Sequence, residues 1–278
     1  MAALAVLAVA AVACAILIGL KPFVSGARYD SAERYTAGGT TLDAPVRNLD
    51  IDWIDGSVTV SCGSQSAVSI AETAPKAISP DAALRWWLDG DTLRIRYAKS
   101  GFSPFRGSGK DLEVILPGDV SLKDVRVGIV SGTLAFDGTG AAAPDIGKMV
   151  LSGASGRIRA SVGSVKEMEI STASGSISLN GNEVQKASVE SASGAIDVAL
   201  NAFGDLRIDA ASGDVALALP SSPGYRAEIE TDSGSFESSA ALTRKGSAYF
   251  CGDGSGTLRV GAVSGDVRLE DARRARLD

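Results

Sequence analysis

Three aspartates are the residues whose type and position could do chemistry. Asp197, Asp214 and Asp266 each stand shortly after a Ser-Gly pair. In a stack of repeated units their carboxylates could align on an outer face, and grouped carboxylates beside a Lys or Arg can act as general acids and bases on acidic polysaccharides. Charged residues at outward strand positions more commonly prevent the aggregation of a sheet. We therefore expect these aspartates to be structural.

The chain contains no histidine, which excludes Ser-His-Asp and Cys-His catalytic arrangements and every His-ligated metal site. The serines beside glycine never form the G-x-S-x-G motif, and the sequence also lacks the phosphate-binding glycine motifs and the calcium-binding nonapeptide. The sequence therefore predicts a protein that is not an enzyme. We expect no catalytic residue, no cofactor, no cofactor-binding residue and no metal ligand.

The charge of the chain argues against nucleic acid as a partner. The formal net charge is -6 at pH 7, whereas nucleic-acid binding depends on clustered Lys and Arg. Arg273, Arg274 and Arg276 form a small basic cluster near the C-terminus, which we interpret as a solvated chain end. We expect no nucleic-acid partner.

An uninterrupted apolar run covers residues 2–20, and Lys21 closes it. Nineteen residues at a rise of 1.5 Å span roughly 28 Å, close to the thickness of a bilayer's hydrocarbon core. Two alternatives stay open: an uncleaved anchor, which we favour, or a signal peptide cut after Ala27. Residues 1–27 should therefore hold the protein in the cell membrane as a single-pass segment, with the remainder outside the cytoplasm, or direct its secretion.

The three cysteines predict neither a lipid anchor nor a disulfide. Cys14 lies within the apolar run and only faintly matches a lipoprotein motif. Cys62 and Cys251 could pair in an oxidising compartment. They stand near opposite ends of the repeated region described below, too far apart for the Cα separation of roughly 7 Å or less that a disulfide needs. We expect two free, partly buried thiols.

A Ser-Gly pair recurs along the chain. Gly156, Gly175, Gly194 and Gly213 are nineteen residues apart. Further copies centre on Ser131-Gly132, Ser233-Gly234 and Ser264-Gly265, with a degenerate copy at Asp55-Gly56. Apolar residues alternate around each pair, for example Leu206, Ile208 and Ala210 before it and Val215, Leu217 and Leu219 after it. A period of two predicts strands, and glycine supplies the positive φ of a turn.

The repeat predicts an all-β fold of stacked units. One unit buries too few aliphatic groups to offset the ordering of its own backbone, so stability requires stacking. We favour a β-helix, or β-solenoid, of about eight rungs with Ser-Gly repeats of about nineteen residues. An antiparallel meander stays open as the alternative.

The expected organisation has three parts. The membrane or signal segment over residues 1–27 is followed by a linker at 28–44 and the β-solenoid repeat domain at 45–278. Within that domain the repeat is interrupted by an inserted hairpin at about 238–254 and preceded by a hairpin at 84–97.

Departures from the repeat are the places where we expect a partner to bind. They include the loop at 100–110 and the hairpin at 238–254. Trp86 and Trp87 are adjacent in a predicted strand and should point to opposite faces. One of them could contact a partner, but we favour a role in covering the end of the solenoid.

The segments IDWIDGSVTV, GDTLRIRY and KDLEVILPGDVSLKDVRVGIVSGTLAF, followed by the Ser-Gly units, resemble the bacterial "putative adhesin" families of β-strand-repeat proteins, over roughly residues 45–270. The resemblance implies a β-helical, often membrane-anchored domain with relatives linked to envelope stress or surface attachment, and it supplies no site residues. We expect a non-enzymatic cell-envelope structural or interaction protein. Its partners would be the membrane, through the N-terminal segment, and an envelope protein or glycan. A polysaccharide-binding or polysaccharide-cleaving β-helix and an accessory protein of envelope-stress signalling are the alternatives.

Overall fold

The computed structural model describes residues 28–101, 109–118, 120–139 and 143–272, and this part of the chain is all-β, as predicted. One short 3-10 turn, η1 (Ala32–Arg34), precedes the strands. None of the described residues belongs to a helix long and apolar enough to span a membrane. The expected membrane segment, Cys14, most of the loop at 100–110 and the C-terminal arginine cluster lie outside the described residues.

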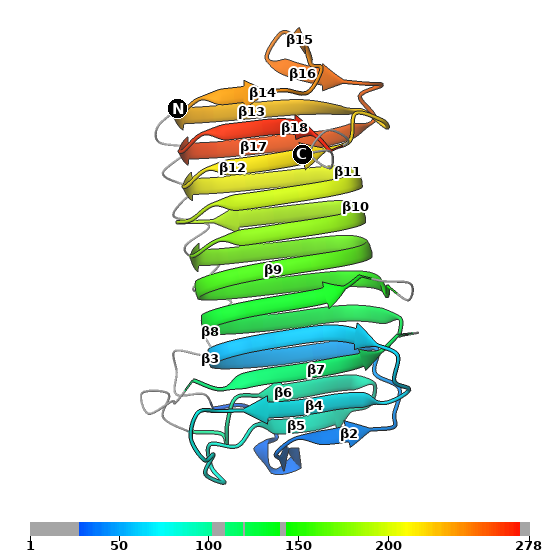
Figure 1. Ribbon diagram of the computed structural model, residues 1–278, viewed down its shortest axis with the longest axis vertical. Coiled ribbons are helices and arrows are strands. Elements are labelled where there is room, and N and C mark those ends of the chain that lie inside the picture. The colour runs from blue at the N-terminus through cyan, green and yellow to red at the C-terminus, as the bar shows by residue number, and fades with distance from the viewer. Residues whose placement is uncertain (1–27, 102–108, 119, 140–142, 273–278) are drawn as a thin grey trace.

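The strands coil into an elongated solenoid (Figure 1). Its central strands are β8 (Leu122–Gly138), β9 (Asp145–Ser174), β10 (Ile177–Ser191), β11 (Ile196–Ser212) and β12 (Val215–Leu219). Ile177 pairs with Ile158 on one side and Ile196 on the other, a parallel shift of nineteen residues in each direction. Parallel pairing shows that the meander alternative is wrong for these strands.

The core is thin and runs along the whole solenoid. Alternate residues point inward from the strands before and after each turn. In β11 and β12 the buried set is the predicted one: Leu206, Ile208, Ala210, Val215, Leu217 and Leu219. The buried side chains form one continuous cluster from Val46 to Leu269. Small aliphatic residues suit this interior because facing strands lie close together.

The glycines of the Ser-Gly turns lie over one another. Gly132 is the register partner of both Gly56 and Gly156. The column continues through Gly175, Gly194, Gly213, Gly265 and Gly234. At Gly194 φ is 129°, and a Cβ there would overlap the carbonyl oxygen of Gly175. Only glycine fits, because L side chains rarely adopt this φ and backbone already fills the space.

The last coils are not stacked in chain order. Six strands form this end: β13 (Tyr225–Ser233), β14 (Phe236–Ser238), β15 (Thr243–Lys245), β16 (Ala248–Cys251), β17 (Gly256–Ser264) and β18 (Val267–Asp271). The later coil, β17 and β18, lies between β11 and β12 on one side and the earlier coil, β13 and β14, on the other. β15 and β16 form an antiparallel hairpin within the predicted 238–254 stretch, and β16 continues the sheet beyond β13. The interruption of the repeat is therefore a detour to the end of the stack and back.

At the opposite end of the solenoid, too, the strands are not stacked in chain order. Its strands are β1 (Thr36–Ala37), β2 (Thr40–Leu42), β3 (Asn48–Gly63), β4 (Val68–Thr73), β5 (Arg85–Asp89), β6 (Thr92–Arg96) and β7 (Asp111–Pro117). β3 pairs in parallel with β8 on one side and with β6 and β7 on the other, so the first long strand lies one coil inside the end. β5 and β6 form the hairpin predicted at 84–97.

Residues 28–44 are part of this end and do not form the expected linker. β1 pairs with β5, and β2 pairs with β4, both antiparallel. The Tyr29 hydroxyl donates a hydrogen bond of 3.0 Å to the carbonyl of Ala98. The linker prediction is wrong here because these strands are short and carry no Ser-Gly signal, so only pairing with distant residues reveals them.

A buried ion pair closes the core at this end. The Lys110 side chain is 2% exposed, and its Nζ lies 2.9 Å from Glu72 Oε2. Nζ also donates to the carbonyls of Ala82 and Tyr97 and lies 5.0 Å from the centroid of the Trp53 ring. Burial lowers the pKa of Lys110, against the opposing effect of its hydrogen bond to Glu72. All three ammonium donors are used, so the group is a structural one.

The glycine column predicts that alanine substitution destabilises the protein much more at Gly194 than at Gly90, although both glycines have a positive φ. Gly194→Ala should lower the free energy of unfolding by about 2–5 kcal/mol, since it combines backbone strain with overpacking. Gly90→Ala, where φ is 62° and the Cβ would meet no atom within 4 Å, should cost only about 1–2 kcal/mol. Chemical denaturation of both variants provides the measurement. Equal losses would contradict the steric role of the column.

The buried ion pair predicts non-additive losses of stability. Lys110→Met should lower the free energy of unfolding by about 3–5 kcal/mol, because it leaves the Glu72 carboxylate buried without its partner. The double variant Lys110→Met/Glu72→Gln should lose less than the sum of the two single variants, which a double-mutant cycle from denaturation curves measures. Strict additivity would show that the two groups are not coupled.

Candidate functional site

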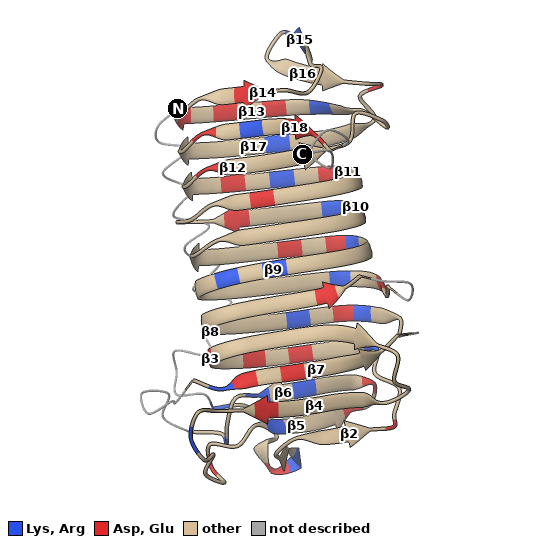
Figure 2. Ribbon diagram, viewed as in Figure 1, with Lys and Arg blue, Asp and Glu red and all other residues tan. Residues whose placement is uncertain are grey.

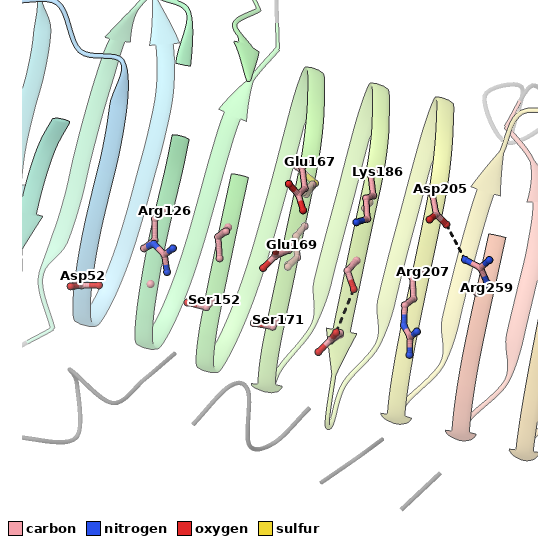
Figure 3. A pocket seen from close by; sticks show the side chains of 17 residues that line it. Asp52, Arg126, Ser152, Glu167, Glu169, Ser171, Lys186, Asp205, Arg207 and Arg259 are labelled. Carbon is pink, nitrogen blue, oxygen red and sulfur yellow. Dashed lines mark hydrogen bonds and ion pairs between the residues drawn. The ribbon is translucent and has the colours of Figure 1, made fainter. Parts of the chain in front are cut away.

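An open groove follows the solenoid axis on the strands that lead into the Ser-Gly turns (Figure 3). Its volume is about 720 Å³, and it crosses β3, β8, β9, β10, β11 and β17. Its polar lining consists of Asp52, Arg126, Ser152, Glu167, Glu169, Ser171, Lys186, Ser188, Glu190, Asp205, Arg207 and Arg259. We call this feature the groove.

Opposite charges alternate along one row of this surface. The register pairs Glu167 with Lys186 and Lys186 with Asp205. Lys148, at the margin of the groove, extends the row, with its Nζ 3.8 Å from Glu167 Oε1. The sign of the charge therefore changes from one coil to the next, at intervals of about 4.8 Å along the row. Figure 2 shows the same mixture of signs over this side of the solenoid.

Several of these charges pair with one another. Arg259 Nη1 lies 3.3 Å from Asp205 Oδ1, and Lys148 Nζ lies 2.8 Å from Glu169 Oε1. Each of these side chains is between about two-fifths and half exposed. Exposed pairs of this kind contribute about 0–1 kcal/mol each to stability, so their arrangement matters more for what the surface can bind than for the fold.

Two basic side chains of the groove form no ion pair with the described residues. Arg126 and Lys186 are exposed, and neither has a carboxylate oxygen of the described residues within the 4.0 Å of an ion pair. The register places Lys186 between the carboxylates of Glu167 and Asp205. Both cations therefore remain available to an anionic group of a partner.

Two carboxyl groups of the groove have raised pKa values. Burial, followed by the charge of the neighbouring Asp209, raises the pKa of Glu190. Burial likewise raises the pKa of Asp52, against the opposing charge of Arg96. Such carboxyl groups take up a proton more readily than exposed ones, so mild acid should make the groove more positive.

The floor of the groove is made of small residues. Gly128, Ser152, Ser171 and Ser188 lie between the charged side chains, and no aromatic residue is part of the described lining. The described residues also contain no group of three or more His, Cys, Asp and Glu that could hold a metal ion. The groove suits an elongated polar ligand that carries charges of both signs.

The three predicted aspartates lie at or just after the turns, outside the groove. Asp214 Oδ1 accepts a hydrogen bond of 2.9 Å from the Asp266 backbone N–H. Asp266 Oδ1 in turn accepts from the N–H and hydroxyl of Ser235, at 2.9 and 2.8 Å. These carboxylates therefore bind the backbone of the neighbouring coil. Asp197 is exposed on the same side, with Ser178 and Ala216 as its register partners.

The predictions for the Trp86–Trp87 pair and for the Cys62 and Cys251 thiols agree with the structure, whereas the prediction for Cys14 stays untested. Trp86 packs against the core, while Trp87, on the other face of β5, contacts Tyr35 with ring centroids 5.7 Å apart. Both lie in the end of the solenoid, as expected of covering residues. Cys62 and Cys251 are free thiols, half-buried in β3 and buried in β16.

The sequence contains a signal for the groove in the charged residues that precede each turn. Lys148, Glu167, Lys186 and Asp205 are nineteen residues apart, like the glycines. Aligning the charged positions before each turn on the repeat would have placed them in one row. Asp214 and Asp266, the candidates that the sequence offers after the turns, bind backbone instead.

One protein family matches more than half of the chain. Residues 116–270 match the family described as Toastrack DUF4097. A structure described as a "putative cell adhesion protein" from Clostridium sporogenes is 12% identical, with a TM-score of 0.37, and the match covers 85% of this chain and 100% of that one. A "putative adhesin" from Bacteroides fragilis is 11% identical, with a TM-score of 0.27 and coverage of 84% and 97%. No curated protein matches the chain.

The hydrogen bonds at Asp266 predict a pH-dependent contribution to stability. Hydrogen bonds from the backbone and side chain of Ser235 lower the pKa of Asp266 below its ordinary value. Its stabilising contribution should therefore be complete above that ordinary value and disappear as the pH falls through the lower folded-state pKa. Carboxyl NMR titration measures the pKa directly, and Asp266→Ala should remove this part of the acid dependence. A pKa at or above about 3.9 would contradict the assignment.

Proposed function

The chain belongs to the Toastrack DUF4097 family, and from this premise we propose that it is a non-enzymatic, adhesin-like interaction protein of the cell envelope. Its groove would be the surface that contacts an extended polar segment of another envelope protein. The proposal is carried by one observation: exposed Arg126 and Lys186 stand unpaired among carboxylates along an open groove.

In this proposal the apolar run at residues 2–20 attaches the chain to the cell membrane, and the remainder is displayed outside the cytoplasm. The run is either a single transmembrane helix or a signal peptide removed before secretion. A solenoid of about eight rungs with Ser-Gly repeats then carries the groove. The uniform coil spacing supports this use, because it repeats a shallow binding surface over a long distance.

The chemistry of the groove favours a protein partner over a glycan. Sugar rings commonly stack on aromatic side chains, and the described lining offers none. A polypeptide carries cations and anions at short intervals, which matches the alternation between Glu167, Lys186 and Asp205. Charge complementarity of this kind contributes mainly to specificity and to the rate of association.

Glu190 keeps a second candidate open, a polysaccharide-binding or polysaccharide-cleaving β-helix. Burial, followed by the charge of the neighbouring Asp209, raises its pKa, and a carboxyl group of raised pKa can act as a general acid. Degradation of cell-wall or acidic glycans by the full chain, abolished in Glu190→Gln, would overturn the non-enzymatic proposal. A role as an accessory of envelope-stress signalling is compatible with the protein partner that we propose.

Site-specific crosslinking tests the proposed surface. A photoreactive residue at position 171, on the groove floor, should form an adduct with a defined envelope protein in intact cells. The same residue at position 197, on the other side of the solenoid, should not. Lys186→Glu should lower the yield about tenfold, the effect of about 1.4 kcal/mol, and high salt should lower it further.

Lys166→Glu is the matched control, since Lys166 is exposed and does not line the groove. It should leave the crosslinking yield unchanged. Equal adducts from positions 171 and 197, or equal effects of the two lysine substitutions, would count against the groove as the binding surface.

A further inference from the structure

The fold holds the chain from residue 29 onward, which leaves a short tether. Besides its hydroxyl bond to Ala98, Tyr29 donates its N–H to Ser100 Oγ at 3.3 Å. Residues 21–28 alone separate this attachment from the apolar run, and eight extended residues reach at most about 29 Å. A linker that continued to residue 44 would have reached about 86 Å. The end of the solenoid that contains Tyr29 must therefore stay close to wherever the apolar run lies.

This same end carries a cluster of aromatic and basic side chains, which we call the basal cluster: Tyr29, Arg34, Tyr35, Trp87 and Arg94. The rings of Tyr29 and Tyr35 are 4.7 Å apart, and Tyr35 meets the edge of Trp87. The guanidinium groups of Arg34 and Arg94 lie 5.2 and 5.8 Å from the centroid of the Trp87 ring. Arg34 is exposed and the three aromatic residues are partly exposed.

Side chains of these types gather at membrane–water interfaces. Trp and Tyr place an apolar ring and a polar group at the level of the lipid headgroups, and Arg adds attraction to phosphate. The acidic neighbours Asp30 and Glu33 are exposed nearby, and Asp89 pairs with Arg94 at 3.3 Å. The basal cluster is therefore not strongly cationic, so contact should depend more on the aromatic residues than on anionic lipid.

We propose that the basal cluster rests on the lipid headgroup layer. The solenoid then stands with β5 at the membrane, its groove open to the side and the β15–β16 hairpin farthest from the bilayer. This inference rests on the membrane attachment of the proposed function. The short tether keeps this end of the solenoid close to the membrane, and the side chains of the basal cluster make the contact with the lipid headgroups.

Tryptophan fluorescence can test the contact, since the chain has three tryptophans. Trp53 is fully buried and Trp86 packs against the core, whereas Trp87 belongs to the basal cluster. The full chain would be reconstituted into phosphatidylcholine vesicles with and without phosphatidylglycerol, made from either brominated or unbrominated acyl chains. Bromine quenches only nearby rings, so brominated lipid should lower the emission, and Trp87→Phe should remove most of that loss.

The variant Trp87→Phe/Lys245→Trp is the distal control, because Lys245 is exposed in the hairpin at the other end. Its new tryptophan should keep its full emission in brominated vesicles. Quenching at position 245 would overturn the upright arrangement. Wild-type chain that floats with vesicles but is not quenched would overturn the basal contact alone. A chain that fails to float would overturn the membrane attachment as well.

Discussion

The structure depends on the close approach of backbone to backbone at the glycine column. At each Ser-Gly turn the carbonyl of one coil occupies the space where a Cβ of the next would lie. Most of these glycines share a positive φ near 118–138°, so the backbone of each coil leaves its turn in the same direction as that of the next coil. The parallel register of these coils follows, and with it the alignment of their side chains from coil to coil. A row of charges such as Lys148, Glu167, Lys186 and Asp205 is thus a consequence of backbone geometry.

The same alignment explains why carboxylates in this protein have two different roles. Directly after a turn, Asp266 accepts a hydrogen bond from the backbone of the adjacent coil, and Asp111, at the start of β7, does the same for Ser57 at the other end. On the strands before the turns, the carboxylates lie beside cations on an open surface. Asp214 and Asp266, close to the turns, accept backbone hydrogen bonds from a neighbouring coil, whereas mid-strand carboxylates such as Glu167 line the groove. Position within the repeat therefore separates structural carboxylates from those available for binding.

The sequence predicts the parts of the fold that rest on local geometry. Alternation of residues such as Leu206 and Ile208 identifies the strands and their buried face, and the spacing of Gly175 and Gly194 identifies the coil. The order of the end coils depends on which of several similar strands pair, and the local pattern of β17 fits any neighbour equally well. For the same reason the sequence predicts a linker in the region where β1 and β2 lie. The groove was predictable only in part, because it arises from charges that are distant in sequence and form no motif.

The inverted order of the end coils has a consequence for fraying. In most stacked repeats the outermost unit is also a chain terminus, so it can peel away and gain the entropy of a free end. Here the segment from β13 to β16 at one end is interior to the chain, and it is joined to β12 on one side and to β17 on the other, both of which remain in the stack. An opened end coil is thus a closed loop, which gains less conformational freedom than a free tail. Chain connectivity therefore protects this end of the solenoid from unravelling, whereas β1 and β2, the outermost strands at the other end, come first among the strands and can fray as a tail.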